Sequence, residues 1–387
     1  MPEYRFARPE EEDEILDFIN LVFSQKARPH DFAKLLPKVY AHPGFSRYHA
    51  VAVENGRIRG TVAMIPLKLR AKGCDFSLRG GYIGSVSVHP RYERRGYMRA
   101  LMDMQLQEAQ RQSLDFVALG GQRQRYGYWG FEKCGVGVKF HVNEANVRHA
   151  LLPLIDENAG KDDLQFIPVN ASQNDALDYI ARLQESQSLF CVRPRELLCD
   201  TLHTYCAQPY LIADAKTGAP VGYFTAFGDD ISELALEDGP DRLNDVIRCW
   251  MKDRKSCSVH LSGYQPELIR PMQAIAENFS FSDSQMMRVL RWDRALTFGL
   301  CLAAAAGYAL PLEDTVLEIQ NAGRLTLSAH GEHPWAHFSP QAEPVCRLSE
   351  KQAVTCLFSS FGALYPPDPA LSPWLPLPLD IPVADQF

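Results

Sequence analysis

The sequence predicts a mixed α/β (α+β) protein with more than one domain. With 387 residues, the chain is too long for a single hydrophobic core. Short apolar runs typical of strands alternate with runs of helical periodicity, and an order of hairpin, strand, helix and strand occurs twice. From about residue 292 the composition of the sequence changes, and the chain ends in a stretch where prolines alternate with apolar residues. We therefore expect three domains, over residues 1–148, 149–291 and 292–387.

Residues 1–148 are expected to contain a helix, a hairpin and a strand–helix–strand unit. Pro9 and the acidic residues 10–13 mark the start of the helix, because negative charge stabilises a helix N-terminus. The dipeptide Asn55-Gly56 predicts a tight turn between two strands. A strand over 82–88 leads to a helix after Gly96, and the apolar run 114–121 predicts a buried strand. A further strand over 136–142 completes the predicted domain.

The middle segment, 149–291, repeats this order without its charged turn. Two predicted strands meet at a turn over 216–218, and a strand, a helix and another strand follow up to about residue 263. Where the first copy has Arg94-Arg95-Gly96, this copy has Glu237-Asp238-Gly239-Pro240. Carboxylates there would repel a phosphate, so we expect a structural domain. The alternative is that the two segments are not a repeat, because any two α/β stretches resemble each other in this order of strands and helices.

The last segment, 292–387, begins with a helix of small residues over 296–307. A hairpin is predicted around 321–323, and Ser349 precedes Gln352 at capping-box spacing before a second helix. The proline-rich tail is apolar, whereas disordered proline-rich tails are polar. We therefore expect the tail to lie extended against the protein, which would place Phe387 and its terminal carboxylate at a defined site.

Composition excludes several classes of function. Apolar residues make up 46% and charged residues 22%, as in ordinary globular proteins, and the net charge of −7 argues against nucleic-acid binding and mildly favours a cationic substrate. The ten cysteines are scattered without ligand spacing, so we expect reduced thiols and no metal site. No signal peptide or membrane span is predicted, and the default is a cytoplasmic protein without a membrane partner.

The turn between the strand 82–88 and the following helix has the parts of an anion site. Four arginines, Arg91, Arg94, Arg95 and Arg99, surround a helix N-terminus whose backbone N–H groups carry partial positive charge. Gly96 allows the backbone to approach a ligand closely. A diphosphate is the natural occupant, and the alternative is a set of solvated arginines beside a helix.

This stretch resembles the acetyl-CoA signature of the GNAT acetyltransferase superfamily, V-x-V-x-P-x-Y-x-x-[RK]-G. The resemblance implies a GNAT fold and acetyl-CoA as cosubstrate. It implies that the strand backbone pairs with the pantetheine arm and that the loop binds the pyrophosphate. The residues that it assigns to the coenzyme are Val86, Ser87, Val88, Arg94, Arg95, Gly96, Tyr97, Met98 and Arg99.

A second stretch, "RYGYWGF" over 125–131, resembles the aromatic element that follows the fifth strand in the same superfamily. By that match Tyr126 lies near the thioester sulfur, where a phenol can donate a proton to the departing thiolate. Tyr128 is the close alternative. A purely structural role for these aromatic residues is the other alternative.

The whole chain resembles the enhanced intracellular survival branch of the superfamily, which has a GNAT domain, a degenerate GNAT-like domain and a sterol-carrier-like domain. The resemblance implies these identities for 1–148, 149–291 and 292–387, and a homo-oligomer, with hexamers known in that branch. It also implies that the terminal carboxylate of Phe387 is the general base. A water relayed from Ser85, His89 or Glu132 is the alternative base.

The predicted function is acetyl-CoA-dependent N-acetylation of a primary amine. The acceptor is expected to be a small cationic molecule, aminoglycoside- or polyamine-like, or a peptide. Glu93 and Met98 depart from the usual loop pattern and motivate the alternative, a non-catalytic acyl-CoA-binding or sensory protein. A lipid-carrying C-terminal domain is a third and less favoured hypothesis.

Overall fold

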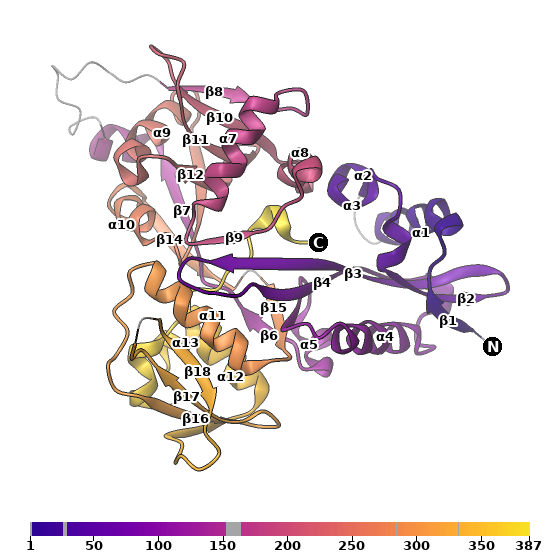
Figure 1. Ribbon diagram of the computed structural model, residues 1–387. Helices are drawn as coiled ribbons and strands as arrows, with labels where there is room; N and C mark the ends of the chain where they lie inside the picture. Colours follow the sequence, from indigo (N-terminus) through magenta and orange to yellow (C-terminus); the bar gives the residue numbers. More distant parts are fainter. Residues whose placement is uncertain (1, 26–28, 152–163, 284, 332) are drawn as a thin grey trace.

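The chain folds around three β-sheets, with helices packed against each of them (Figure 1). The structure is a computed structural model that describes residues 2–25, 29–151, 164–283, 285–331 and 333–387. The mixture of sheets and helices confirms the predicted α/β class.

The first sheet holds most of the strands predicted for the first domain. Its neighbours are antiparallel except for β4 and β5, which are parallel. The predicted hairpin turn is confirmed, with left-handed backbone at Asn55 (φ 54°) and Gly56 (φ 68°). In spatial order the strands are β1 (Glu3–Phe6), β2 (His49–Glu54), β3 (Arg57–Ala71), β4 (Leu78–Val88), β5 (Phe116–Leu119), β15 (Gln285–Val289) and β6 (Glu132–Cys134), with β9 (Leu189–Cys191) on the far end of β3.

Helices cover both faces of this sheet (Figure 1). On one face lie α1 (Glu12–Ser24), α2 (Phe32–Leu35) and α3 (Pro37–Tyr40), and α4 (Tyr97–Arg111) lies on the other. The apolar side of α1 is buried as its periodicity predicted, at Ile15, Phe18, Ile19 and Val22. The sheet is therefore the central layer of a three-layer arrangement.

The parallel strands β4 and β5 separate along their length. Their pairing covers only Gly80–Ile83 and Phe116–Leu119, whereas β4 stays paired with β3 as far as Val88. A bulge in β4 interrupts that second pairing near Ser85, whose φ of 49° is left-handed. Backbone groups from Gly84 onward consequently face an opening on the β5 side.

The second sheet belongs mainly to the middle segment, but two strands cross between the sheets. β7 follows the first sheet in sequence and pairs in the second, while β15 follows the second and inserts between β5 and β6 of the first. The two sheets are thereby interlocked. The second sheet runs β14 (Asn278–Ser282), β7 (Gly137–Asn143), β13 (Ser256–Ser262), β12 (Asp230–Leu236), β11 (Pro220–Phe227), β10 (Gln208–Asp214) and β8 (Leu164–Pro168), and its helices are α7 (Asn174–Glu185), α8 (Leu198–Leu202), α9 (Leu243–Trp250) and α10 (Pro266–Ile275).

The third sheet lies in the C-terminal segment. The predicted capping box is confirmed, because the Ser349 hydroxyl accepts a bond from the Gln352 N–H at the start of α12. The sheet consists of β18 (Trp335–Phe338), β17 (Gly323–Ser328), β16 (Thr315–Ile319) and β19 (Cys346–Leu348), and its helices are α11 (Trp292–Ala305), α12 (Glu350–Phe358) and α13 (Ser360–Leu364).

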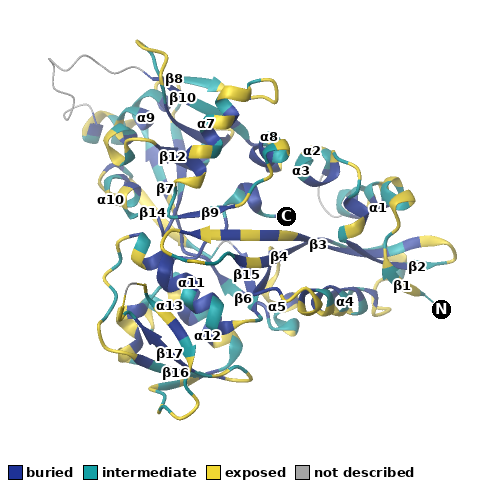
Figure 2. Ribbon diagram, viewed as in Figure 1, coloured by how far each residue is buried: buried dark blue, intermediate teal, exposed yellow. Residues whose placement is uncertain are grey.

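The proline-rich tail lies against the protein, as predicted. Four of its apolar side chains, those of Trp374, Leu377, Leu379 and Ile381, are at most 2% exposed. The tail ends between the first two sheets, close to α2, α3 and β9 (Figures 1 and 2). The last residue of the sequence is therefore held in the interior of the molecule.

Candidate active site

Two cavities meet where β4 and β5 separate. One, of about 570 Å³, lies at the N-terminus of α4 and is called here the Gly96 cavity. The other, of about 400 Å³, lies between β4, β5 and the helices α1 and α2 and is called the Tyr126 cavity. Val86 and Arg125 line both cavities, which are therefore adjacent.

The Gly96 cavity contains nearly all of the residues predicted to bind a coenzyme. Arg94 (φ 65°) and Gly96 (φ 83°) both have left-handed backbone, which turns the loop tightly before α4 begins. The first N–H groups of α4 have no carbonyl partner within the helix, and they lie beside this cavity. The predicted residues that line it are Val86, Ser87, Val88, Arg94, Gly96, Tyr97, Met98 and Arg99.

Arg95 is the predicted coenzyme residue that does not line the Gly96 cavity. Its guanidinium lies over the ring of Tyr92, 4.7 Å from the ring centroid, and 3.7 Å from the carboxylate of Glu54. In its place α5 (Arg123–Tyr126) contributes Arg125. The sequence analysis missed Arg125 as an anion ligand because it follows β5, far in sequence from the glycine-containing loop.

Tyr126 lines the cavity named after it and is buried, with 6% of its surface exposed. Burial raises the pKa of its phenol, and the nearby Arg125 opposes that rise. Tyr128, the predicted alternative, is 68% exposed, lies against Arg99 and lines neither cavity. Of the two tyrosines, Tyr126 is the one that lines a cavity.

Phe387 lines the same cavity as Tyr126. Its ring packs against Gly84 on β4, where an added Cβ atom would lie only 2.5 Å from the ring. Its ring centroid is 6.0 Å from that of Tyr40. Glycine at position 84 is therefore required for the last residue to reach β4.

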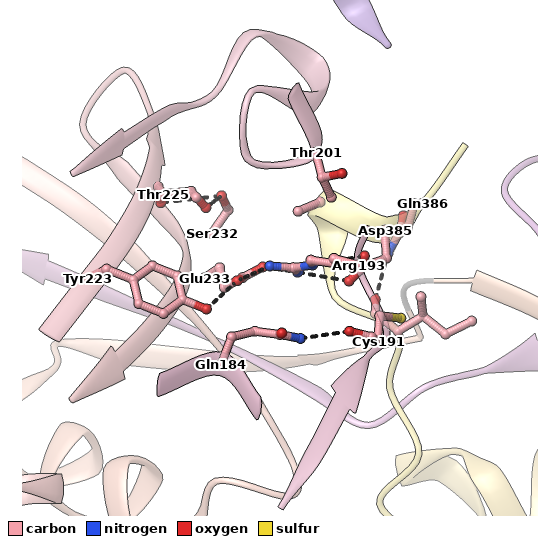
Figure 3. A network of polar contacts seen from close by, with 12 residues as sticks. Gln184, Cys191, Arg193, Thr201, Tyr223, Thr225, Ser232, Glu233, Asp385 and Gln386 are labelled. Carbon is pink, nitrogen blue, oxygen red and sulfur yellow. Dashed lines mark hydrogen bonds and ion pairs between the residues drawn. The ribbon is translucent and has the colours of Figure 1, made fainter. Parts of the chain in front are cut away.

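Buried charges hold the segment just before Phe387. The Lys38 ammonium donates to the carbonyls of Ala384 (2.5 Å) and Gln386 (2.7 Å), and burial lowers the pKa of Lys38 to about 8. The Arg193 guanidinium lies between Asp385 and Glu233 and bonds both carboxylates (Figure 3). Burial alone would lower the pKa of Arg193, but the two carboxylates raise it well above its usual value, so the group stays charged.

A chain of hydrogen bonds leads from Ser85, in the wall of the Tyr126 cavity, into the core. The Thr61 hydroxyl donates to the Ala50 carbonyl, so it accepts from Nδ1–H of His49 at 2.8 Å. Nε2 of His49 then accepts from the Tyr40 hydroxyl at 3.2 Å, and the Tyr40 oxygen accepts from Ser85 at 2.6 Å.

Burial fixes these protonation states. It lowers the pKa of His49 to about 3 and raises the pKa of Tyr40, so both groups remain neutral. The Ser85 hydrogen is committed to Tyr40, and the Ser85 oxygen is left as a hydrogen-bond acceptor. The sequence analysis named Ser85 but missed Tyr40 and His49, which no local motif marks.

The other two residues considered for relaying a water lie elsewhere. His89 caps the short turn after β4, where its Nδ1 accepts from the N–H of Arg91, and Glu132 is bound by Arg123 at 2.8 Å. Neither lines the Tyr126 cavity. Of the three candidates for a water relay, only Ser85 is near Tyr126 and Phe387.

Over the described ranges, no helix combines the length and the apolar character needed to cross a bilayer. Within the same part of the chain, no group of three or more His, Cys, Asp and Glu side chains is placed to hold a metal ion.

Comparison with known proteins bears on the fold and on the domain that carries the two cavities. Three solved structures share the fold over nearly the full length of the chain, and no curated protein sequence matches it. A GCN5-related N-acetyltransferase from Kribbella flavida has a TM-score of 0.66 at 15% identity, covering 100% of this chain and 98% of its own. One from Anabaena variabilis has 0.61 at 17% (92% and 89%), and Eis1 from Mycobacterium abscessus has 0.60 at 15% (92% and 89%).

The sequence itself matches a domain family. Residues 3–134 match the model of the acetyltransferase (GNAT) domain, and this range includes the strand β4, the Gly96 loop and Tyr126. The resemblance stated from the two motifs is thereby confirmed for this domain. Residues 3–134 of the chain therefore form an acetyltransferase (GNAT) domain.

Proposed function

We propose that this protein transfers the acetyl group of acetyl-CoA directly to the primary amine of a small cationic molecule or a peptide. The observation that carries the proposal is the meeting of two cavities at the opening between β4 and β5. One cavity has the charge and backbone donors for a pyrophosphate, and the other contains Tyr126 and Phe387. In our proposal the first cavity holds the coenzyme and the second holds the amine, so that the thioester lies where the two cavities meet.

The residues around Gly96 fit the coenzyme that the domain family uses. Left-handed backbone at Arg94 and Gly96 leaves room for a ligand against the N-terminus of α4, and nothing lies within 4 Å of a Cβ placed on Gly96. Arg94, Arg99 and Arg125 supply positive charge. Beyond Ile83 the pairing of β4 with β5 ends, and in our proposal the β4 backbone there pairs with the amides of the pantetheine arm.

Acetyl transfer requires one base and one acid. The amine nitrogen attacks the thioester carbonyl, its C–N bond forms and the C–S bond breaks. In our proposal the Phe387 carboxylate takes the proton released from the amine, and the Tyr126 phenol donates a proton to the departing thiolate. The raised pKa of Tyr126 is compatible with this role, because the phenol then keeps its proton at neutral and moderately alkaline pH.

The test consists of two measurements, and the first compares CoA binding by two arginine variants. Arg94→Gln is expected to weaken CoA binding about tenfold in calorimetry, because a charged hydrogen-bond partner of the phosphate is lost. Arg111→Gln removes the same charge from the far end of α4, where Arg111 pairs with its neighbour Glu108, and should leave the affinity unchanged. The second measurement is CoA release from acetyl-CoA over a panel of primary amines. Unchanged CoA affinity in Arg94→Gln would contradict the proposed site, and tight CoA binding without release on any amine would favour the non-catalytic, sensory alternative.

A further inference from the structure

We propose that the acceptor is a primary amine carried on one aromatic or bulky apolar group, without a second positive charge. The inference rests on the proposed function and narrows its acceptor class. It follows from the composition of the Tyr126 cavity, from the charges in its wall and from the number of hydrogen-bond acceptors beside Phe387.

The wall of the Tyr126 cavity is largely aromatic and apolar. Successive ring contacts run from Phe23 to Phe32 (centroids 4.9 Å apart) and from Phe32 to Tyr40 (5.7 Å), and Tyr40 contacts Phe387. Val22, Leu35 and Leu36 complete this side. An apolar or aromatic group bound against this wall is stabilised by the removal of apolar surface from water and by ring-to-ring contact. A charged group gains little binding free energy from the same wall.

The charges of the wall disfavour a polycation. Among the described residues that line the cavity, none is Asp or Glu, and the guanidinium of Arg125 offsets the negative charge of the Phe387 carboxylate. A second ammonium group on the acceptor would lose its hydration on entering the cavity. It would find no carboxylate side chain there to pair with. Tyr205 offers no negative charge either, because burial raises the pKa of its phenol to about 12.

The polar groups beside Gly84 match a single amine. The Ser85 oxygen is a hydrogen-bond acceptor, because its hydrogen is committed to the Tyr40 chain. Phe387 is packed on Gly84, next to Ser85. One amino group can therefore donate to Ser85 and lose a proton to the terminal carboxylate, while the rest of the molecule occupies the aromatic part of the cavity.

The test compares three amines as acetyl acceptors at one pH by kcat/KM. 1,4-Diaminobutane and 1-butylamine have the same length and differ in the second charge, and 2-phenylethylamine carries an aromatic ring. We expect the diamine to be at least about tenfold poorer than 1-butylamine, because the extra charge loses its solvation. We expect 2-phenylethylamine to be about tenfold better than 1-butylamine because it buries more apolar surface.

A variant of the wall provides an independent readout. Leu35 is half-buried, so Leu35→Glu places a carboxylate in the cavity with limited damage to the core. It should raise kcat/KM for 1,4-diaminobutane relative to 1-butylamine, whereas the matched neutral change Leu35→Gln should not. Thermal unfolding of both variants checks that they fold. If they do not, the comparison of the three amines with the wild-type protein tests the inference by itself.

Two outcomes would overturn the inference while leaving the proposed function standing. One is a diamine that is acetylated as efficiently as 1-butylamine or better. The other is a higher kcat/KM for octanoyl-CoA than for acetyl-CoA with 2-phenylethylamine, which would show that the apolar cavity takes the acyl chain. CoA binding without release on any amine would instead overturn both.

Discussion

Tyr126 and Tyr128 differ in burial. The burial of Tyr126 favours it over Tyr128 as the acid in our proposal. The phenol of Tyr126 lies in a cavity and has a raised pKa, whereas Tyr128 is exposed to solvent. The motif favoured Tyr126 by its spacing, and the structure supplies a physical reason for the same choice. Its role as the acid stays a prediction.

Tyr126→Phe tests that role with the smallest change. The variant keeps the ring and removes the hydroxyl, so kcat should fall about 100-fold while the KM for acetyl-CoA changes much less. Tyr128→Phe is the matched control and should keep wild-type turnover. Full turnover by Tyr126→Phe, in conditions where the chemical step limits the rate, would exclude the phenol as the acid.

The pH dependence of kcat follows from the direction of the same shift. A phenol with a raised pKa keeps its proton at pH values where an ordinary tyrosine, with a pKa near 10, begins to lose it. The attacking amine must be neutral, so the rate should rise with pH on the alkaline side. Any fall caused by loss of the acid should begin only above about pH 10. A decline that begins at the same pH in wild type and in Tyr126→Phe would show that another group causes it, and a decline below pH 9 that is absent from Tyr126→Phe would contradict the raised pKa of Tyr126.

At the level of elements, the tail and the helix α3 act together. Lys38 on α3 binds two carbonyls of the tail, and Gly84 on β4 provides the space in which the Phe387 ring packs. The composition of the tail predicted that it would be buried, because apolar prolines and leucines gain stability from leaving water. Which element holds its end could not be predicted, since Lys38 lies more than three hundred residues earlier in a stretch with no binding motif.

Lys38→Met is expected to loosen the tail without disturbing the coenzyme site. Loss of two hydrogen bonds from a charged donor should displace Phe387 from the cavity and lower kcat about tenfold or more. The CoA dissociation constant should stay unchanged. Lys34→Met is the control, because Lys34 is exposed and pairs with Asp31 of the same segment. A proportional loss of CoA affinity in Lys38→Met would point to general misfolding and not to tail positioning.

At the scale of the whole molecule, buried ion pairs and exchanged strands join the segments. Arg193 follows β9 and links Glu233 of the second sheet to Asp385 of the tail (Figure 3). β7 and β15 exchange between the first two sheets. We propose 1–148, 149–291 and 292–387 as the three segments of the chain, although its sheets do not divide at those boundaries. The sterol-carrier-like character of the last segment, the oligomeric state and a cytoplasmic location stay predictions.

Arg193→Met should destabilise the protein strongly. It leaves two buried carboxylates without their cation, which costs about 3–5 kcal/mol in the free energy of unfolding. Arg195→Met breaks the exposed pair with Asp178 and should cost at most about 1 kcal/mol. Denaturant unfolding of the two variants measures the difference. Equal midpoints for both would show that the Arg193 network contributes little to holding the tail and the second sheet together.

The sequence by itself determined the local features of this protein. The Asn55-Gly56 turn, the helix at Gly96, the capped helix at Ser349 and the burial of the tail each follow from conformational preference or hydrophobicity over a few residues. The same local signals carried the resemblance to GNAT acetyltransferases, because a phosphate-binding loop is built from consecutive residues.

Only the tertiary structure decided which distant residues meet. It placed Arg125 and not Arg95 in the Gly96 cavity, put Phe387 against Gly84, and linked Ser85 through Tyr40 to His49. These contacts depend on how separate elements pack, and packing is a property of the whole chain that no short pattern encodes. The Tyr126 cavity is formed by such contacts, which is why its aromatic wall could not be predicted from the motifs.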